Sequence, residues 1–154
     1  MAVKEAFNPY GFQPLYPDDA RVEYYKVAAS QTIAKGDPVI LSSGQVAIAV
    51  QASSTELLGI AAEASAGAAA NTLIAIYDDP DTVFVGRASA DASSTQIGSY
   101  LDLTGTTGAF EVNVSASSQD LFTYLGVKAG DDHTQAGAHL KVKLNKHALA
   151  DTSS

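Results

Sequence analysis

The sequence predicts an all-β fold: a single compact β-barrel or sandwich-like domain built from two similar halves, with an extended N-terminal arm. Three observations support this prediction: short apolar segments separated by turn residues, an internal repeat, and a proline-rich start. A chain of 154 residues suits one domain, and 46% apolar residues suffice for a core. Since there is no cysteine, disulfides and thiolate sites are excluded.

The arm, residues 1–23, combines prolines with aromatic side chains. It holds three of the five prolines, and six of the twelve aromatics lie in the first 25 residues. Proline restricts φ and removes a backbone donor, so an extended segment is expected, and such a segment does not bury its own side chains. One hypothesis is that the arm folds back along its own domain. The other is that it contacts a neighbouring subunit or a larger assembly through Phe7, Tyr10, Phe12, Leu15 and Tyr16.

The β domain, residues 24–146, reads as a series of short strands. The first is expected at 24–28, and a hairpin around Ser42, Ser43 and Gly44 follows over 38–50. Residues 65–71 and 117–122 are the only segments that suggest short helices. Pro80 and its neighbouring aspartates favour a tight turn between two of the later strands. These later strands are expected at 56–62, 72–79, 83–89, 99–103, 109–114, 123–129 and 139–145.

An internal repeat relates residues 36–77 to residues 98–144. "GDPVIL" from Gly36 matches "GSYLDL" from Gly98, "IAVQASS" matches "VNVSASS", and "LLGIAA" matches "YLGVKA". The spacing between the copies changes only at turns or loops, as insertions do. Gly59 and Gly126 occupy equivalent strand positions, which predicts a bulge or a close backbone approach. Residues 147–154 are expected to form a flexible tail.

The repeated pattern "KGDPVIL … LLGIAAEA … VFVG … IGSYLDL … YLGVKA … LKVKL" resembles the capsid-cement (head decoration) proteins of tailed bacteriophages. The resemblance covers roughly residues 24–145 through short, degenerate pieces. It implies a small β-rich protein that binds the outside of an assembled phage head as a homotrimer. The arm is the part that the resemblance covers least.

Composition and motifs exclude several function classes. A net charge of −8 argues against binding nucleic acid, because that affinity comes mostly from Lys and Arg contacts to phosphates. The start lacks an apolar signal region and no run approaches the roughly 20 apolar residues that span a bilayer, so no membrane partner is expected. Since hydrolase, phosphate-binding and dinucleotide-binding motifs are missing, neither an enzyme nor a cofactor is expected.

Two clusters could bind a metal, and for each the structural interpretation is favoured. His133, with Asp131 and Asp132, would need to converge with the other two histidines. His139, however, is expected on the solvent face of its strand beside Lys141 and Lys143, with Leu140, Val142 and Leu144 inward. The "DDPD" run, Asp78 to Asp81, offers oxygens for calcium, but turn formation is its usual role. No metal site is therefore predicted.

Lys141, Lys143 and Lys146 form a basic stripe in an acidic chain. One interpretation is an edge strand that lysines protect against sheet-to-sheet aggregation. The other is a patch that docks electrostatically on an acidic coat-protein surface. The sequence does not separate these two interpretations.

The expected function is structural. The chain would be made in the host cytoplasm, bind the outer surface of the virion capsid, contact the major capsid protein and itself, and clamp adjacent coat subunits. Binding only the assembled state would stabilise that state by mass action. The alternative is a carbohydrate-binding or adhesive β-sandwich on a virion or cell surface, although the chain has no tryptophan to serve as a sugar platform.

Overall fold

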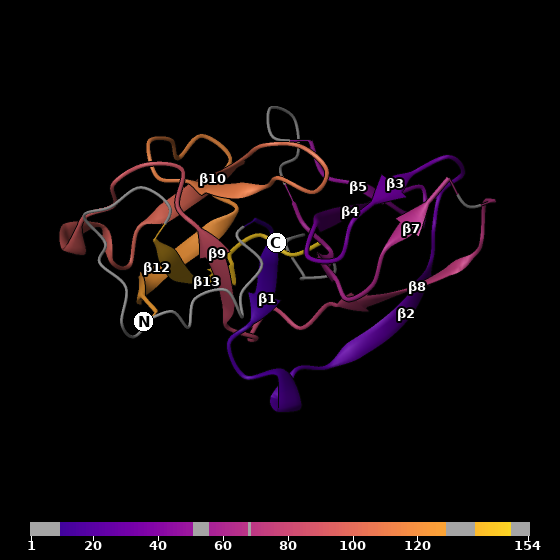
Figure 1. The fold of residues 1–154 in the computed structure, drawn as a ribbon, viewed down its shortest axis with the longest axis horizontal. Coiled ribbons are helices and arrows are strands. Elements are labelled where there is room, and N and C mark those ends of the chain that lie inside the picture. The colour runs from indigo at the N-terminus through magenta and orange to yellow at the C-terminus, as the bar shows by residue number, and fades with distance from the viewer. Residues whose placement is uncertain (1–9, 51–55, 68, 129–137, 149–154) are drawn as a thin grey trace, which may run out of the picture.

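The computed structural model describes residues 10–50, 56–67, 69–128 and 138–148, and these form three antiparallel sheets (Figure 1). The five-stranded sheet has the order β2 (Val22–Lys26), β8 (Leu73–Tyr77), β6 (Gly59–Ala61), β4 (Pro38–Ser42), β5 (Gln45–Ile48). The six-stranded sheet has the order β1 (Phe12–Pro14), β9 (Phe84–Arg87), β13 (His139–Leu144), β12 (Phe122–Val127), β10 (Tyr100–Thr104), β11 (Glu111–Asn113). A short third sheet pairs β3 (Thr32–Ile33) with β7 (Ser65–Ala66).

The all-β, sandwich-like prediction is confirmed, but the sheets do not close into a barrel. A single parallel bridge between Val27 and Val46 links the two outer strands of the five-stranded sheet at one end. The only helical turns in the described ranges are the 3₁₀ segments η2 (Pro17–Asp19) and η3 (Ser94–Gln96).

The two segments that repeat in sequence have the same strand order. In the first, β8, β6, β4 and β5 are neighbours, and in the second β13, β12, β10 and β11 are. The correspondence extends beyond the sequence repeat, because β2 adds to β8 in the same way that β9 adds to β13. Each half therefore contains five strands in one order, and β1 is an additional strand outside β9. Figure 1 shows the two sets of strands side by side.

Gly59 and Gly126 fulfil the two roles that the sequence predicts for them. A Cβ at Gly59 would lie 2.1 Å from the carbonyl oxygen of Tyr77, so this position requires a close backbone approach. Gly126 has a φ of 120° and lies where the β12–β13 register shifts between Tyr124 and Gly126. That conformation suits glycine, so the second position is a bulge.

The halves share one large core. Buried Phe84, Phe110, Phe122 and Tyr124 of the second half pack in one cluster with Leu57, Ile60 and Ala49 of the first half. A smaller cluster lies within the first half and includes Val39, Val46, Leu58, Ile74 and Ile76. Because side chains from both halves are buried together, the chain packs as one domain.

Four expectations about local structure are corrected. Ser65–Ala66 is a strand that pairs with β3. Residues 117–122 are not a helix, because the N–H groups of residues 118–120 donate to the Asp102 carboxylate and Phe122 begins β12. The segment expected to form an arm contributes β1 to the sheet. His147 is buried, and Ala148 donates its N–H to the carbonyl of Leu57 at 2.9 Å. The packed domain thus extends beyond residue 146, where the tail was expected to begin.

Candidate functional site

The N-terminal arm forms an edge strand on its own domain. In β1, Phe12 pairs with Gly86, and Pro14 with Phe84, which are residues of β9. Proline is tolerated here because an edge strand needs to donate fewer ladder hydrogen bonds. Phe12 is 3% exposed, and its ring stacks on that of Phe122 with centroids 5.0 Å apart. Since Gly86 has no side chain, the Phe12 ring lies directly over its backbone, where a Cβ would come within 2.4 Å.

This burial corrects one predicted contact. Phe12 was expected to contact a neighbouring subunit or a capsid, but its side chain belongs to the core of its own chain. The hypothesis that the arm folds back on its own domain holds for β1. Sequence patterning could not reveal the burial of Phe12, because the space for its ring depends on Gly86, which is distant in sequence.

Tyr10 and Leu15 are half-buried on either side of β1. The guanidinium of Arg87 lies 5.0 Å from the centroid of the Tyr10 ring, and its Nε is 2.7 Å from the Glu111 carboxylate. The N–H of Leu15 donates to the carbonyl of Val83 at 2.9 Å. These contacts hold both ends of β1 against the domain. Phe7 lies outside the described residues.

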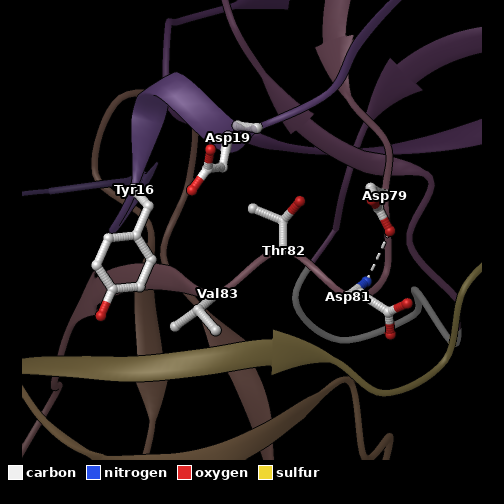
Figure 2. A pocket seen from close by; sticks show the side chains of 7 residues that line it. Tyr16, Asp19, Asp79, Asp81, Thr82 and Val83 are labelled. Carbon is white, nitrogen blue, oxygen red and sulfur yellow. Dashed lines mark hydrogen bonds between the residues drawn. The ribbon is translucent and has the colours of Figure 1, made fainter.

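Of the predicted contact residues that the structure describes, Tyr16 is the exposed one, with 63% of its surface accessible. It borders an open pocket of about 150 Å³ that is also lined by Asp19, Asp79, Asp81 and Thr82 (Figure 2). In Figure 2, Asp19 lies on the side of Thr82 nearer Tyr16, whereas Asp79 and Asp81 lie on the other side. The carboxylates therefore do not converge.

The "DDPD" run forms the predicted turn. Asp79 Oδ1 accepts a hydrogen bond from the N–H of Asp81 at 2.9 Å, and its carbonyl accepts from Thr82 at 3.1 Å. This is the side-chain to backbone bonding that makes aspartate favourable in turns. Within the described ranges, no group of three or more histidine, aspartate or glutamate side chains is arranged to hold a metal ion.

Asp78, the first residue of that run, has a different role that the sequence analysis missed. Its carboxylate is 2% exposed and accepts hydrogen bonds from Arg21 Nη2 at 2.9 Å and from the Tyr25 hydroxyl at 2.5 Å. Burial, and then the hydrogen bond to Asp78, raise the pKa of Tyr25 to about 12. Asp78 thereby fixes β2 to the end of β8. The only available signal was its position directly after a strand.

Two further buried carboxylates have structural roles. Asp37 Oδ1 accepts from the N–H of Gly108 at 3.0 Å and its Oδ2 from Ala34 at 2.9 Å, so it joins the two halves. Burial raises the pKa of Asp37 above its ordinary value. Asp102 accepts from three consecutive backbone N–H groups, those of residues 118–120. Both side chains satisfy backbone donors that no strand partner reaches.

Two lysines of the stripe, Lys141 and Lys143, lie on a central strand, and Lys146 follows its end. β13 is between β9 and β12, so the interpretation of these lysines as protection of an edge strand is wrong. The predicted alternation along β13 is confirmed: His139, Lys141 and Lys143 are half-buried, and the intervening Leu140, Val142 and Leu144 are buried. Lys143 Nζ is 3.8 Å from Asp81, which is itself 87% exposed, and this pair contributes little to stability. Lys146 is exposed.

An exposed apolar face lies on β2 and β8. Val22 is 39% exposed, Tyr24 65% and Leu73 59%. Pairing places Lys26 opposite Leu73, Tyr24 opposite Ala75 and Val22 opposite Tyr77, so the three apolar side chains share one face of the two strands. We call Val22, Tyr24 and Leu73 the β2–β8 face. The sequence analysis missed it, because alternation alone does not show which face is covered.

Comparison with protein-family models and with curated proteins finds no match to this chain. No helix in the described part of the chain is long and apolar enough to cross a membrane.

Proposed function

We propose that this chain is a non-enzymatic capsid decoration protein that binds the outer surface of an assembled phage head and clamps adjacent coat subunits. The β2–β8 face is the observation that carries the proposal. Three large apolar side chains on neighbouring strands form the kind of exposed surface that proteins use to bind one another. Burying each would contribute roughly 1.5–3 kcal/mol, before the cost of association is subtracted.

The lysine stripe supports the same proposal. Lys141, Lys143 and Lys146 are cations on the outer side of an acidic protein, and the position of β13 removes edge protection as their explanation. A cationic stripe steers a protein toward an acidic surface and raises the association rate more than the affinity. An acidic coat surface is the proposed partner of the stripe, and three copies bound as a homotrimer would add avidity.

A carbohydrate-binding role is the second candidate, and one observation favours it. The exposed ring of Tyr16 borders an open pocket that Asp19 and Thr82 also line. An exposed aromatic ring with nearby polar groups is the usual composition of a sugar site. This role would place the function at the pocket rather than on the β2–β8 face.

The test mixes the purified protein with empty phage heads and images them by electron microscopy. We expect decoration that is strongly reduced by Tyr24→Ser with Leu73→Ser. Tyr100→Ser is the matched control, because Tyr100 is 48% exposed on the other half of the molecule. Equal decoration by all variants, or binding to glycans without binding to heads, would contradict the proposal.

The electrostatic part has its own test. Replacing Lys141, Lys143 and Lys146 with glutamine should slow association with heads and weaken its dependence on salt, because screening acts on exposed charges. Circular dichroism should show an unchanged fold, since these side chains lie outside the core. If neither the rate nor its salt dependence changes, the stripe has no part in docking.

A further inference from the structure

The strand β2 lies at the outside of the five-stranded sheet (Figure 1), and its backbone is oriented toward a further strand. Ala75 of β8 lies opposite Tyr24. The carbonyl of Ala75 accepts a hydrogen bond from the N–H of Ala62 at 2.9 Å, and its N–H donates to the Glu63 carboxylate at 2.9 Å. Ala75 and Tyr24 are therefore a non-hydrogen-bonded pair of the antiparallel ladder. It follows that the N–H and carbonyl of Tyr24 point away from β8, to the outer side of β2.

The same orientation holds for Val22 and Lys26, because it repeats every two residues along a strand. Ala28, two residues further, fits this pattern, since its N–H points outward and donates to the carbonyl of Val46 in β5 at 2.9 Å. The strand β5 thus covers the edge from Ala28 onward. Val22, Tyr24 and Lys26 precede that point, and all three are exposed. They form an open edge of three outward-facing residues.

The other outer strands of the two large sheets present no comparable edge in the described ranges. In β1, the N–H of Phe12 donates to the carbonyl of Gly36 at 2.8 Å, and Pro14 has no N–H. The outer side of β11 accepts from Ser89, whose N–H lies 2.9–3.1 Å class distance, 3.0 Å, from the carbonyl of Val112. The outer side of β5 accepts from the end of β2. Among these outer strands, the edge that fits an open β2 edge is therefore another β2.

One register suits the pairing of two β2 edges. We propose that two copies of the chain pair through antiparallel β2 strands, with Tyr24 opposite Tyr24 and Val22 opposite Lys26 of the second copy. A shift of the second copy by two residues in one direction would set Glu23 against Glu23, and like charges directly opposite are destabilising. The same shift in the other direction would set Val22 against Ala28, which β5 already covers.

The pairing would join the two five-stranded sheets into one and would use the edge of β2, so the β2–β8 face stays open on one side of that sheet. It does not depend on the decoration function. Because the pairing is two-fold, it is a separate contact from the homotrimer of the decoration proposal. The contact involves five residues of each copy, and interfaces below roughly 1,000 Å² are weak or transient. A covalent reporter is therefore the appropriate test.

Because the chain has no cysteine, an interchain disulfide can report the register directly. Tyr24→Cys would set two thiols opposite each other, at a Cα separation of about 5.5 Å, which a disulfide can bridge. Val22→Cys is the matched control on the same face of the same strand, since the two thiols would lie four residues apart along the strands, about 13 Å. Lys26→Cys alone is a second control of the same kind. A mixture of the Val22→Cys and Lys26→Cys variants again sets two thiols opposite each other.

Under mild oxidation at equal protein concentration, we expect Tyr24→Cys to form covalent dimers at least about tenfold faster than either control alone. The mixture of the two controls should form mixed dimers at a rate close to that of Tyr24→Cys. Non-reducing electrophoresis measures the rates, and peptide mass spectrometry identifies the joined residues. Equal rates for the three single variants, or fast dimers of either control alone, would overturn the proposal.

A proline tests the contribution of the backbone. Val22→Pro removes one outward N–H and leaves the hydrogen bonds between β2 and β8 in place, and proline is tolerated at the first residue of a strand. Added to Tyr24→Cys, it should lower the rate of dimer formation to that of the controls, whereas Val22→Ser, which keeps the N–H, should not. Circular dichroism checks the fold of each variant. An unchanged rate in a folded Val22→Pro variant would contradict strand pairing, and if that variant does not fold, the mixed dimers decide.

Discussion

The packing of Phe12 over Gly86 should couple the arm to the stability of the whole domain. Phe12→Ala removes a ring that is 3% exposed and stacks on Phe122. Such substitutions cost about 3–5 kcal/mol. This is a large part of the roughly 5–15 kcal/mol by which domains are stable. Gly86→Ala places a Cβ 2.4 Å from the Phe12 ring, which must then move, so a loss of about 1–3 kcal/mol is expected from overpacking.

The two substitutions should be strongly non-additive. Once Phe12→Ala has removed the ring, the methyl group of Gly86→Ala meets no clash and should cost less than about 0.5 kcal/mol in that background. Equilibrium urea unfolding, followed by circular dichroism, measures this non-additivity in the wild-type chain, the two single variants and the double variant. Tyr16→Ala, at 63% exposure, is the control and should change the free energy of unfolding by less than about 0.5 kcal/mol. Additive losses would refute the argument that Gly86 makes room for Phe12.

Three further predictions concern ionisation and the arm. Ultraviolet titration should show a tyrosine that ionises near pH 12, and Tyr25→Phe should remove this step. The stabilisation linked to the raised pKa of Tyr25 is fully present below pH 10.0 and is lost as the pH rises through about 12. Burial raises the pKa of Asp37 in the folded protein. The stabilisation linked to this shift is fully present below pH 3.8 and is lost as the pH rises through the higher pKa of the folded state. Asp37→Asn should therefore flatten the dependence of the melting temperature on acidic pH. Deleting residues 1–20 should abolish cooperative unfolding, because the deletion removes β1 and Phe12, and an unchanged melting temperature would contradict this expectation.

The strands were predictable because their signals are local. Alternation along 139–144 assigned each side chain of β13 to its face, and turn residues such as Gly44, with a φ of 79°, marked the β4–β5 hairpin. The repeat further indicated two halves of similar strand order. The sequence did not show which strands pair with each other. A central strand with one solvent face has the same alternation of apolar and polar residues as an edge strand. The lysines of β13 were therefore open to a wrong interpretation.

The candidate site was harder to predict, because its residues depend on distant partners. The ring of Phe12 is buried because it lies over Gly86 and stacks on Phe122, and nothing near Phe12 in the sequence indicates these two partners. Asp78 and Asp79 are neighbours of one type, yet one receives an arginine and a tyrosine while the other makes a turn. Residue type and position predicted the turn, but only the fold separates the two roles.

The strand β1 makes the two halves unequal in how their sheets can grow. β9 and β2 hold equivalent places, but β1 pairs along the outer edge of β9, whereas the outer edge of β2 meets β5 only at one end, through the bridge between Val27 and Val46. A free edge accepts the backbone of another chain, whereas a covered edge does not. The outer strand beyond β9 is therefore β1, whose Pro14 has no N–H to offer to a further strand. Proline on an edge strand hinders the addition of another chain, so the sheets of the two halves differ in how readily they can be extended.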